Sequence, residues 1–145
     1  MDHSVLLLLA EDEPLIALSL EVALQEAGFT ILHVLSAEDA IRAVDESHGS
    51  LSGVITDIKF GGSLDGWAVA RHARERVAGV PVVYMSGDSA HDHTVQGVPD
   101  SIMLQKPFAP AQLITAIATL LNAAHAHQAP PTLPVIQIEP KPTPT

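Results

Sequence analysis

Five short apolar segments alternate along the chain with segments of helical periodicity. Each apolar segment is bounded by polar or turn-forming residues, as strands are. The expected strands are Val5 to Ala10, Thr30 to Val34, Gly53 to Asp57, Pro81 to Met85 and Ser101 to Gln105. Val5 to Ala10 is apolar at every position, which is typical of a strand covered on both faces. Because strand and helix alternate five times, the pattern predicts an α/β fold, a doubly wound parallel sheet with helices on both faces.

Helix start and stop signals lie between the first strands. A helix is expected from Pro14 to about Ala27, with proline at its first position and Gly28 ending it. Ser36 is the expected N-cap of a second helix, and Asp39, three residues later, gives a weak capping box.

The sequence of the second half of the chain predicts three further helices. One begins near Asp65. The segment Gly87 to Gly97 contains weak helix formers and predicts only one or two turns, with Ala90 and Val95 facing the core. A final helix is expected from Ala109 to about His127.

The composition indicates one domain followed by a tail. At 145 residues with 47% apolar residues, the chain is long enough for a hydrophobic core. We assign residues 1–127 to the domain. Residues 128–145 are proline-rich, which precludes regular helix and favours an extended, largely disordered chain. The apolar patch of this tail is Val135-Ile136-Gln137-Ile138.

Charge and residue usage exclude several classes of function. The net charge is −10 with only seven Lys and Arg residues, which argues against nucleic-acid binding. The absence of cysteine excludes disulfides, zinc–thiolate sites and cysteine nucleophiles. The N-terminus lacks the basic start of a signal peptide, and Val5 to Ala10 is too short to span a bilayer. The expected location is the cytoplasm.

Four of the expected strands end in polar groups that suit phosphate chemistry. Glu11 and Asp12 follow the first strand, Asp57 ends the third, Ser86 follows the fourth and Lys106 follows the fifth. In doubly wound sheets, ligands bind beyond the carboxyl ends of the strands. A carboxylate there can attack a phosphoryl group and form an acyl phosphate. Crowded carboxylates favour Mg²⁺ as the counter-cation, and a lysine can hold a phosphoryl oxygen.

Each of these residues has an ordinary alternative role when it is considered alone. Glu11 and Asp12 can cap the following helix, Asp57 can be a turn residue, Ser86 can be a helix cap, and Lys106 can be a solvated loop lysine. The combination on four separate strand ends is what favours a common site.

Two short histidine segments are weak metal-site candidates. They are His91-Asp92-His93 and His125-Ala126-His127. Histidines are more often surface or core side chains than ligands, so we assign no metal to either segment.

In chain order, the motifs resemble those of the response-regulator receiver domain of two-component signalling. They are Glu11-Asp12-Glu13-Pro14, Asp57, Asp65-Gly66, Ser86-Gly87 and Lys106-Pro107-Phe108. The resemblance covers residues from about Val5 to Ala124. It implies a flavodoxin-like five-stranded sheet in the order 2-1-3-4-5. It also implies phosphotransfer to Asp57 from a histidine kinase or a histidine phosphotransfer protein, with at most slow self-catalysed phosphorylation and dephosphorylation.

The same resemblance implies the site roles. Mg²⁺ would be held by Asp12, the Asp57 carboxylate and the backbone carbonyl of Lys59, with Glu11 acting through water. Ser86 would move toward the phosphoryl group, and Lys106 would pair with it.

Three features depart from the family pattern. Met103 stands three residues before Lys106, where the family usually has an aromatic switch residue, so Ser86 must couple to another group or the coupling is weak. The loop from Asp57 to Asp65 contains Gly61-Gly62, lacks the usual proline and is one residue longer. The fourth helix is short, so the usual output face is altered.

Partners are expected to carry the output. Only the proline-rich tail follows the receiver-like region, so we expect a single-domain regulator. The segment Phe108 to Gln128 contains no Asp, Glu, Lys or Arg, which suggests that the final helix, Ala109 to His127, contacts a downstream protein or a second copy. Ile16 and Leu20 extend the apolar surface of the first helix, where family members dock kinases.

Two other functions remain open. A phosphohydrolase with an aspartyl nucleophile usually has a second acid two residues after the nucleophile, whereas this chain has Lys59. A receiver-like interaction module that is never phosphorylated would keep the motifs for structural reasons alone.

Overall fold

Five parallel strands form one sheet in the order β2-β1-β3-β4-β5. The protein is represented by a computed structural model that describes residues 4–88 and 90–128. The strands are β1 (Val5–Ala10), β2 (Phe29–Val34), β3 (Leu51–Asp57), β4 (Val82–Ser86) and β5 (Ile102–Gln105). The strand order and the all-parallel pairing confirm the predicted α/β, flavodoxin-like fold.

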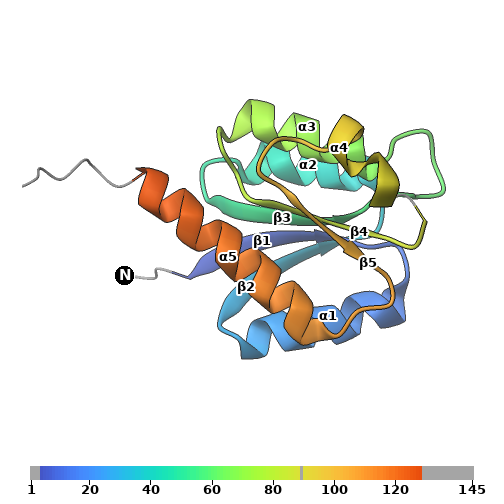
Figure 1. Cartoon of the computed structure of the whole chain (residues 1–145), viewed down its shortest axis with the longest axis horizontal. Coiled ribbons are helices and arrows are strands. Elements are labelled where there is room, and N and C mark those ends of the chain that lie inside the picture. The colour runs from blue at the N-terminus through green and yellow to red at the C-terminus, as the bar shows by residue number, and fades with distance from the viewer. Residues whose placement is uncertain (1–3, 89, 129–145) are drawn as a thin grey trace, which may run out of the picture.

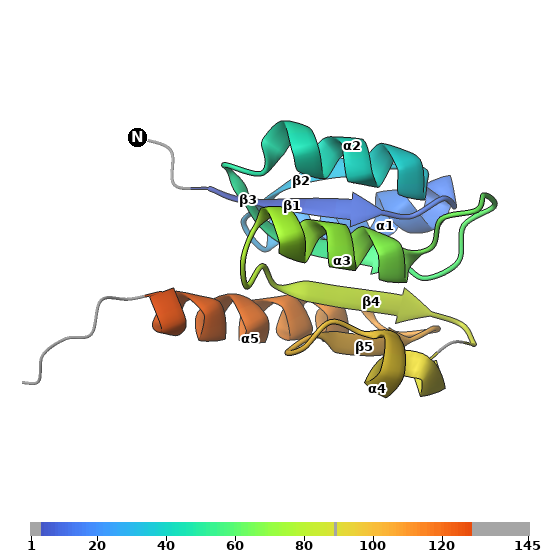
Figure 2. The same cartoon turned by 90° about the horizontal axis from the view of Figure 1, so that it is seen from above.

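Helices cover both faces of this sheet (Figure 1). They are α1 (Pro14–Glu26), α2 (Ala37–Ser47), α3 (Gly66–Arg76), α4 (His93–Gln96) and α5 (Pro110–Gln128), with a short 3₁₀ turn η1 (Ala90–Asp92) before α4. Helices α1 and α5 lie on one face, and α2 and α3 lie on the other (Figures 1 and 2).

The hydrophobic core is divided by the sheet into two layers. Leu8 of β1 packs in the layer under α2 and α3, whereas its neighbours Leu7 and Leu9 pack in the layer under α1 and α5. Side chains of a strand alternate between the two faces, so a strand with helices on both sides is apolar throughout. All three leucines are fully buried, which confirms that reading of β1.

The helix boundaries follow the local signals. The Ser36 hydroxyl accepts a hydrogen bond from the Asp39 N–H at 3.0 Å, and an Asp65 carboxylate oxygen accepts one from the Ala68 N–H at 3.0 Å. Gly28, one residue after the C-cap of α1, has φ of 103°, a conformation that glycine adopts without a side-chain clash.

Two expectations about packing are wrong. Val95 was expected to face the core but is 83% exposed. The single turn of α4 instead turns His93 toward the sheet, where its ring contacts Tyr84, so Val95 two residues later points away. The third strand begins at Leu51 rather than at Gly53, because Leu51 is buried and pairs with Leu6 of β1.

The outer surface of α1 also differs from the expectation. Leu20 is buried and Ile16 packs against the core, so neither forms an outer surface. Leu15, Leu18 and Val22 are exposed instead, by 82%, 57% and 44%. Their spacing places them on one side of the helix, opposite the buried residues.

The final helix continues to Gln128, one residue beyond the expected boundary. Residues 129–145, with the patch Val135–Ile138, lie outside the described residues, so the tail and its boundary stay predictions. Within residues 4–88 and 90–128, no helix combines the length and apolar character that a membrane crossing requires.

Candidate functional site

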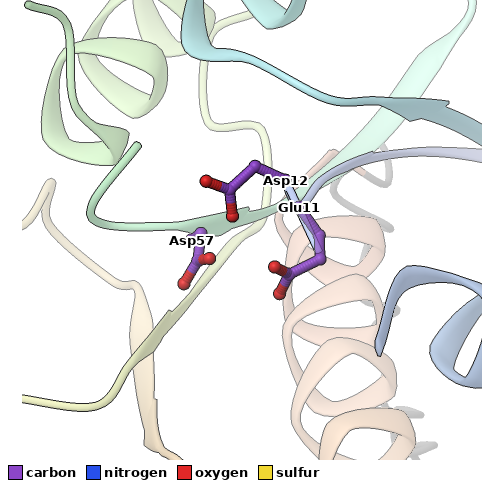
Figure 3. A group of neighbouring side chains, drawn as sticks. All are labelled: Glu11, Asp12 and Asp57. Carbon is purple, nitrogen blue, oxygen red and sulfur yellow. The ribbon is translucent and has the colours of Figure 1, made fainter. Parts of the chain in front are cut away.

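The polar residues at the strand ends converge on the carboxyl edge of the sheet. Glu11 and Asp12 follow β1, and Asp57 is the last residue of β3. Figure 3 shows the three carboxylates gathered at this edge, with that of Asp12 directed toward Asp57. One oxygen from each lies within 4.8 Å of the others. Among the residues that the structure describes, this is the one cluster of three or more His, Asp or Glu side chains with metal-binding spacing.

Backbone hydrogen bonds fix these strand ends relative to one another. The Glu11 N–H donates to the Val34 carbonyl at 3.1 Å, and the Lys106 N–H donates to the Ser86 carbonyl at 2.8 Å. These bonds continue the sheet pairing one residue past the strands. Side chains that are distant in sequence are therefore held by the sheet itself.

Lys106 pairs with two of the carboxylates. Its Nζ lies 3.1 Å from Oε1 of Glu11 and 3.1 Å from Oδ1 of Asp57. The Lys106 side chain is 25% exposed, and the Glu11 side chain is fully buried. With the exposed Asp12, the cluster holds three carboxyl groups for this one ammonium, so carboxylates are in excess at the site.

The protonation of Asp57 responds to this surplus. Burial, followed by repulsion from Glu11, raises the pKa of Asp57 to about 7, although Lys106 acts in the opposite direction. Burial alone lowers the pKa of Lys106, but attraction to Asp57 and Glu11 outweighs it, so the net pKa is raised. Lys106 is thus held in its charged form, and the raised pKa of Asp57 is of the kind that a further cation nearby would lower.

Glu11 is occupied on both oxygens. Its Oε2 accepts a hydrogen bond from the Glu13 N–H at 3.0 Å, while Oε1 faces Lys106. Both oxygens of Asp57 also lie near Lys106, at 3.1 and 3.3 Å from Nζ, so the exposed Asp12 is the carboxylate with the freer geometry for a cation. This donor set consists of oxygens alone and suits a hard ion such as Mg²⁺.

Ser86 ends β4 beside this cluster and is buried. Its Oγ accepts a hydrogen bond from the Asp88 N–H at 3.1 Å. The Asp88 carboxylate pairs with Nζ of Lys59 at 3.1 Å, so an ion pair joins the loop after β3 to the loop after β4. Sequence reasoning considered only the backbone carbonyl of Lys59 and missed this contact, since nothing in the sequence links the two loops.

Two other contacts at the site were also missed. A Cβ atom at Gly66 would collide with the Asp57 carbonyl oxygen, and the Gly66 N–H donates to the Ile58 carbonyl at 2.7 Å. His33 places Nε2 3.0 Å from the Glu11 carbonyl oxygen. The available signal for His33 was a histidine beside the last residue of a strand that is mostly apolar.

An aromatic side chain from β4 lies on the face where Met103 replaces the expected aromatic residue. Tyr84 pairs with Met103 in the sheet register and is fully buried. Its ring centroid lies 4.6 Å from that of Trp67 and 5.7 Å from that of His93. The aromatic contact between the sheet and α4 therefore comes from β4.

Comparison with known proteins gives a consistent family assignment. The family model described as "Response regulator receiver domain" matches residues 7–118. The crystal structure of a response regulator receiver protein from Sinorhizobium medicae is 47% identical, has a TM-score of 0.81, and is matched over 83% of this chain and 97% of that one.

Two further relatives are more distant. The transcriptional regulatory protein GltR of Pseudomonas aeruginosa is 31% identical over 126 residues, which are 84% of this chain and 51% of GltR. The other is the receiver domain of a sensor histidine kinase from Pseudomonas aeruginosa, described with a magnesium ion coordinated in its active site cleft. It is 22% identical, has a TM-score of 0.71, and is matched over 82% of this chain and 98% of that one. At this identity the likeness shows the fold alone. The chain spans about half, or less, of the length of the curated relatives that it matches.

Proposed function

Because this chain belongs to the response regulator receiver domain family, we propose that it accepts a phosphoryl group on Asp57 from a histidine kinase or a histidine phosphotransfer protein. It then signals through protein partners. The observation that carries the proposal is the Lys106 ammonium 3.1 Å from the Asp57 carboxylate, beside Glu11 and Asp12 at the carboxyl edge of the sheet.

The transfer forms one bond and breaks one. A lone pair of an Asp57 oxygen forms the O–P bond while the P–N bond of a phosphohistidine breaks, and the imidazole nitrogen keeps the bonding electrons. Lys106 turns from Asp57 to a phosphoryl oxygen and offsets its charge, and the Ser86 hydroxyl donates a second hydrogen bond. Positioning and charge neutralisation are the main requirements of phosphoryl transfer.

Mg²⁺ fits the residues of the site. The carboxylates of Asp12 and Asp57 and the backbone carbonyl of Lys59 would hold it, with Glu11 acting through water because both Glu11 oxygens already have partners. The ion supplies positive charge to the transferring phosphoryl oxygens. Surplus carboxylate charge in the site and the magnesium ion described for the Pseudomonas receiver domain support this assignment.

Family members are phosphoacceptors rather than classical enzymes. We propose that self-catalysed phosphorylation and dephosphorylation are at most slow. The position two residues after Asp57 is Lys59, whose side chain pairs with Asp88, so no acid is available there for the phosphohydrolase alternative. We also propose a cytoplasmic location.

The proposed test uses a small phosphodonor. Wild type, Asp57→Asn and the control Asp92→Asn are treated with acetyl phosphate and Mg²⁺ and separated on a phosphate-affinity gel. Wild type and the control should shift, Asp57→Asn should not, and the shift should be lost with hydroxylamine, as an acyl phosphate requires. An unshifted wild type would support the unphosphorylated module. Repeated turnover of a generic phosphate ester, abolished in Asp57→Asn, would support the phosphohydrolase.

The kinase or phosphotransfer protein is proposed to dock on α1. Leu15, Leu18 and Val22 form its exposed apolar side, and they replace Ile16 and Leu20 as the residues to test. Leu18→Glu should slow transfer from a phosphorylated kinase but not from acetyl phosphate. Val95→Glu, which places the same charge on another exposed apolar position, should change neither rate. Equal slowing of both donors by Leu18→Glu would contradict α1 docking.

The output partner is proposed to contact α5, either as a downstream protein or as a second copy. The described outer positions of α5 include Thr115 and Thr119, and no large apolar side chain of α5 is exposed, which favours a weak or regulated contact. Light scattering after size exclusion, on wild type and Thr115→Glu with and without acetyl phosphate, tests the homodimer. A monomer in every condition excludes it.

A further inference from the structure

A groove of about 390 Å³ lies at the amino edge of the sheet, at the opposite end from the carboxylate cluster. Its apolar lining comes from the starts of β1 and β3, the α3–β4 connection and the last turns of α5. These side chains are Val5, Leu51, Val77, Pro81, Leu121 and Ala124. The volume lies within the range of specific binding pockets.

The groove is uncharged apart from one histidine. Among the described residues that line it, none is Asp, Glu, Lys or Arg, and His125 is the titratable one. An apolar, uncharged segment can enter such a groove without desolvating a charge. The tail supplies a segment of this kind, since no charged residue occurs between Phe108 and Glu139.

The end of α5 brings the tail to the groove. The last turns of α5 extend past the amino ends of the strands in both views (Figures 1 and 2). His125 lines the groove, and Gln128, where α5 ends, follows about 4.5 Å further along the axis at 1.5 Å per residue. Residues 129–134 can span about 19 Å when extended at 3.1 Å per residue, so Val135–Ile138 can fold back to the groove.

The sequence of the patch suits an extended segment with one apolar side. Side chains alternate in an extended chain, so Ile136 and Ile138 share a side and Gln137 is on the other. A short tether also gives the patch an effective concentration in the millimolar range, which favours it over a free competitor.

We propose that Val135–Ile138 binds this groove in cis, with Ile136 and Ile138 against the side chains of α5 and the α3–β4 connection. The tail then covers the apolar amino edge of the sheet and leaves the carboxylate edge open. The proposal is independent of phosphorylation at Asp57.

Paramagnetic relaxation tests the proposal in the full chain. The protein has no cysteine, so Gln137→Cys gives a single attachment point for a nitroxide, on the side of the patch that faces solvent. Amide signals of Ser52, Ala78 and Asn122 should lose intensity, while that of Gly61 at the opposite edge should not. The same label in Ile136→Ser/Ile138→Ser is the matched control, because it keeps the tether and removes only the apolar side chains.

The outcomes separate the possible occupants. Intensity loss at the groove in the single variant, reduced in the double-serine background, supports binding in cis. Equal loss in both backgrounds reflects proximity alone and overturns the proposal, as does no loss in either. The last outcome uses a mixture in which one protein is isotope-labelled without a nitroxide and the other carries the nitroxide without isotope labels. Intensity loss at the groove in this mixture means that the tail of a second copy occupies the groove, which also overturns the proposal.

Two measurements without a label complete the test. Backbone order parameters at Ile136 and Ile138 should resemble those of the folded domain, about 0.85, rather than those of a flexible chain, below about 0.6. Ala124→Glu, which places a carboxylate in the groove, should lower them, whereas Thr115→Glu elsewhere on α5 should not. Flexible values in the wild type would overturn the proposal and leave the groove to another occupant.

Discussion

His93 of α4 meets Tyr84 of β4 edge to face, with ring centroids 5.7 Å apart and an interplanar angle of 70°. Nε2 of His93 lies 2.8 Å from the Ser101 hydroxyl, and the Tyr84 hydroxyl accepts a hydrogen bond from the Val98 N–H at 3.0 Å. One turn of helix is thereby attached to β4 and to the segment that leads into β5. The contact lies two residues from Ser86, so it offers a route from the site to α4 that does not need an aromatic residue at Met103.

Loss of the His93 ring should destabilise the domain. We expect His93→Ala to lower the free energy of unfolding by about 1–2 kcal/mol, since an aromatic pair and a hydrogen bond each contribute about 1 kcal/mol. Urea unfolding measures this. His91→Ala is the control, because that side chain is 78% exposed, and its effect should stay within about 0.5 kcal/mol. Equal effects of the two substitutions would contradict a role for the ring contact.

Gly66 should not tolerate a side chain. The Cβ of Gly66→Ala would meet the backbone carbonyl of Asp57, which cannot move without displacing the end of β3. We expect a loss of about 3 kcal/mol or more in unfolding free energy and a loss of acetyl phosphate labelling, by analogy with overpacked cores. Gly61→Ala, in the same connection and with no atom within 4 Å of its Cβ, should remain stable and labelled. A stable, labelled Gly66→Ala variant would show that the β3–α3 connection can relax.

Removing the Lys106 ammonium should expose the repulsion between the carboxylates. Lys106→Ala leaves Glu11 and Asp57 without their shared partner, and we expect a loss of about 2–3 kcal/mol at pH 8. The loss should be smaller at pH 5, where Asp57 is protonated, and Mg²⁺ should restore part of it at pH 8. Lys59→Ala is the control, with both side chains of its ion pair 68% exposed, and should cost less than about 1 kcal/mol.

Asp57→Asn should stabilise the metal-free domain, and more so at neutral pH. The folded pKa of about 7 lies above the ordinary aspartate value of 3.8, so the folded state binds more protons than the unfolded state between these values. The contribution of protonated Asp57 to the free energy of unfolding is thus fully present below about pH 4. It is lost as the pH rises through about 7. The advantage of the variant should grow over this window to about 1–3 kcal/mol.

Thermal unfolding in EDTA measures the effect as a rise of a few degrees in Tm. Repeating the series with Mg²⁺ is the control, because a cation stabilises the ionised wild-type site and not the amide. The advantage of Asp57→Asn should then shrink or reverse. A difference that is independent of pH would indicate that Asp57 is not crowded in the folded state.

The sequence predicted the features that depend on local pattern. The uninterrupted apolar run of β1 requires helices on both faces, and the polar residues at four strand ends meet because parallel strands end at one edge. The convergence of Glu11, Asp12, Asp57 and Lys106 therefore followed from topology.

Features that depend on contacts between distant segments were not predictable. Nothing local indicates that Lys59 pairs with Asp88 or that His33 contacts the Glu11 carbonyl. The sequence misplaces Val95 because an apolar residue need not be buried: in the single turn of α4 it is His93 that packs against the sheet, which leaves Val95 exposed. The sequence likewise assigns the exposed side of α1 to the wrong residues, because apolar residues occur on all sides of that helix and no single stripe marks the buried face.

The hydrogen bond from the Lys106 N–H to the Ser86 carbonyl joins the ends of the two strands whose side chains are proposed to bind the phosphoryl group. A shift of the backbone at Lys106 or at Ser86 would therefore also displace the end of the neighbouring strand. Tyr84 is on the same strand as Ser86 and contacts His93 of α4, so a displacement of the Lys106 backbone would also be transmitted to α4. The residue proposed to neutralise the phosphoryl charge and the residue that contacts α4 are thus connected through the backbone of the sheet, by a path that does not include Met103.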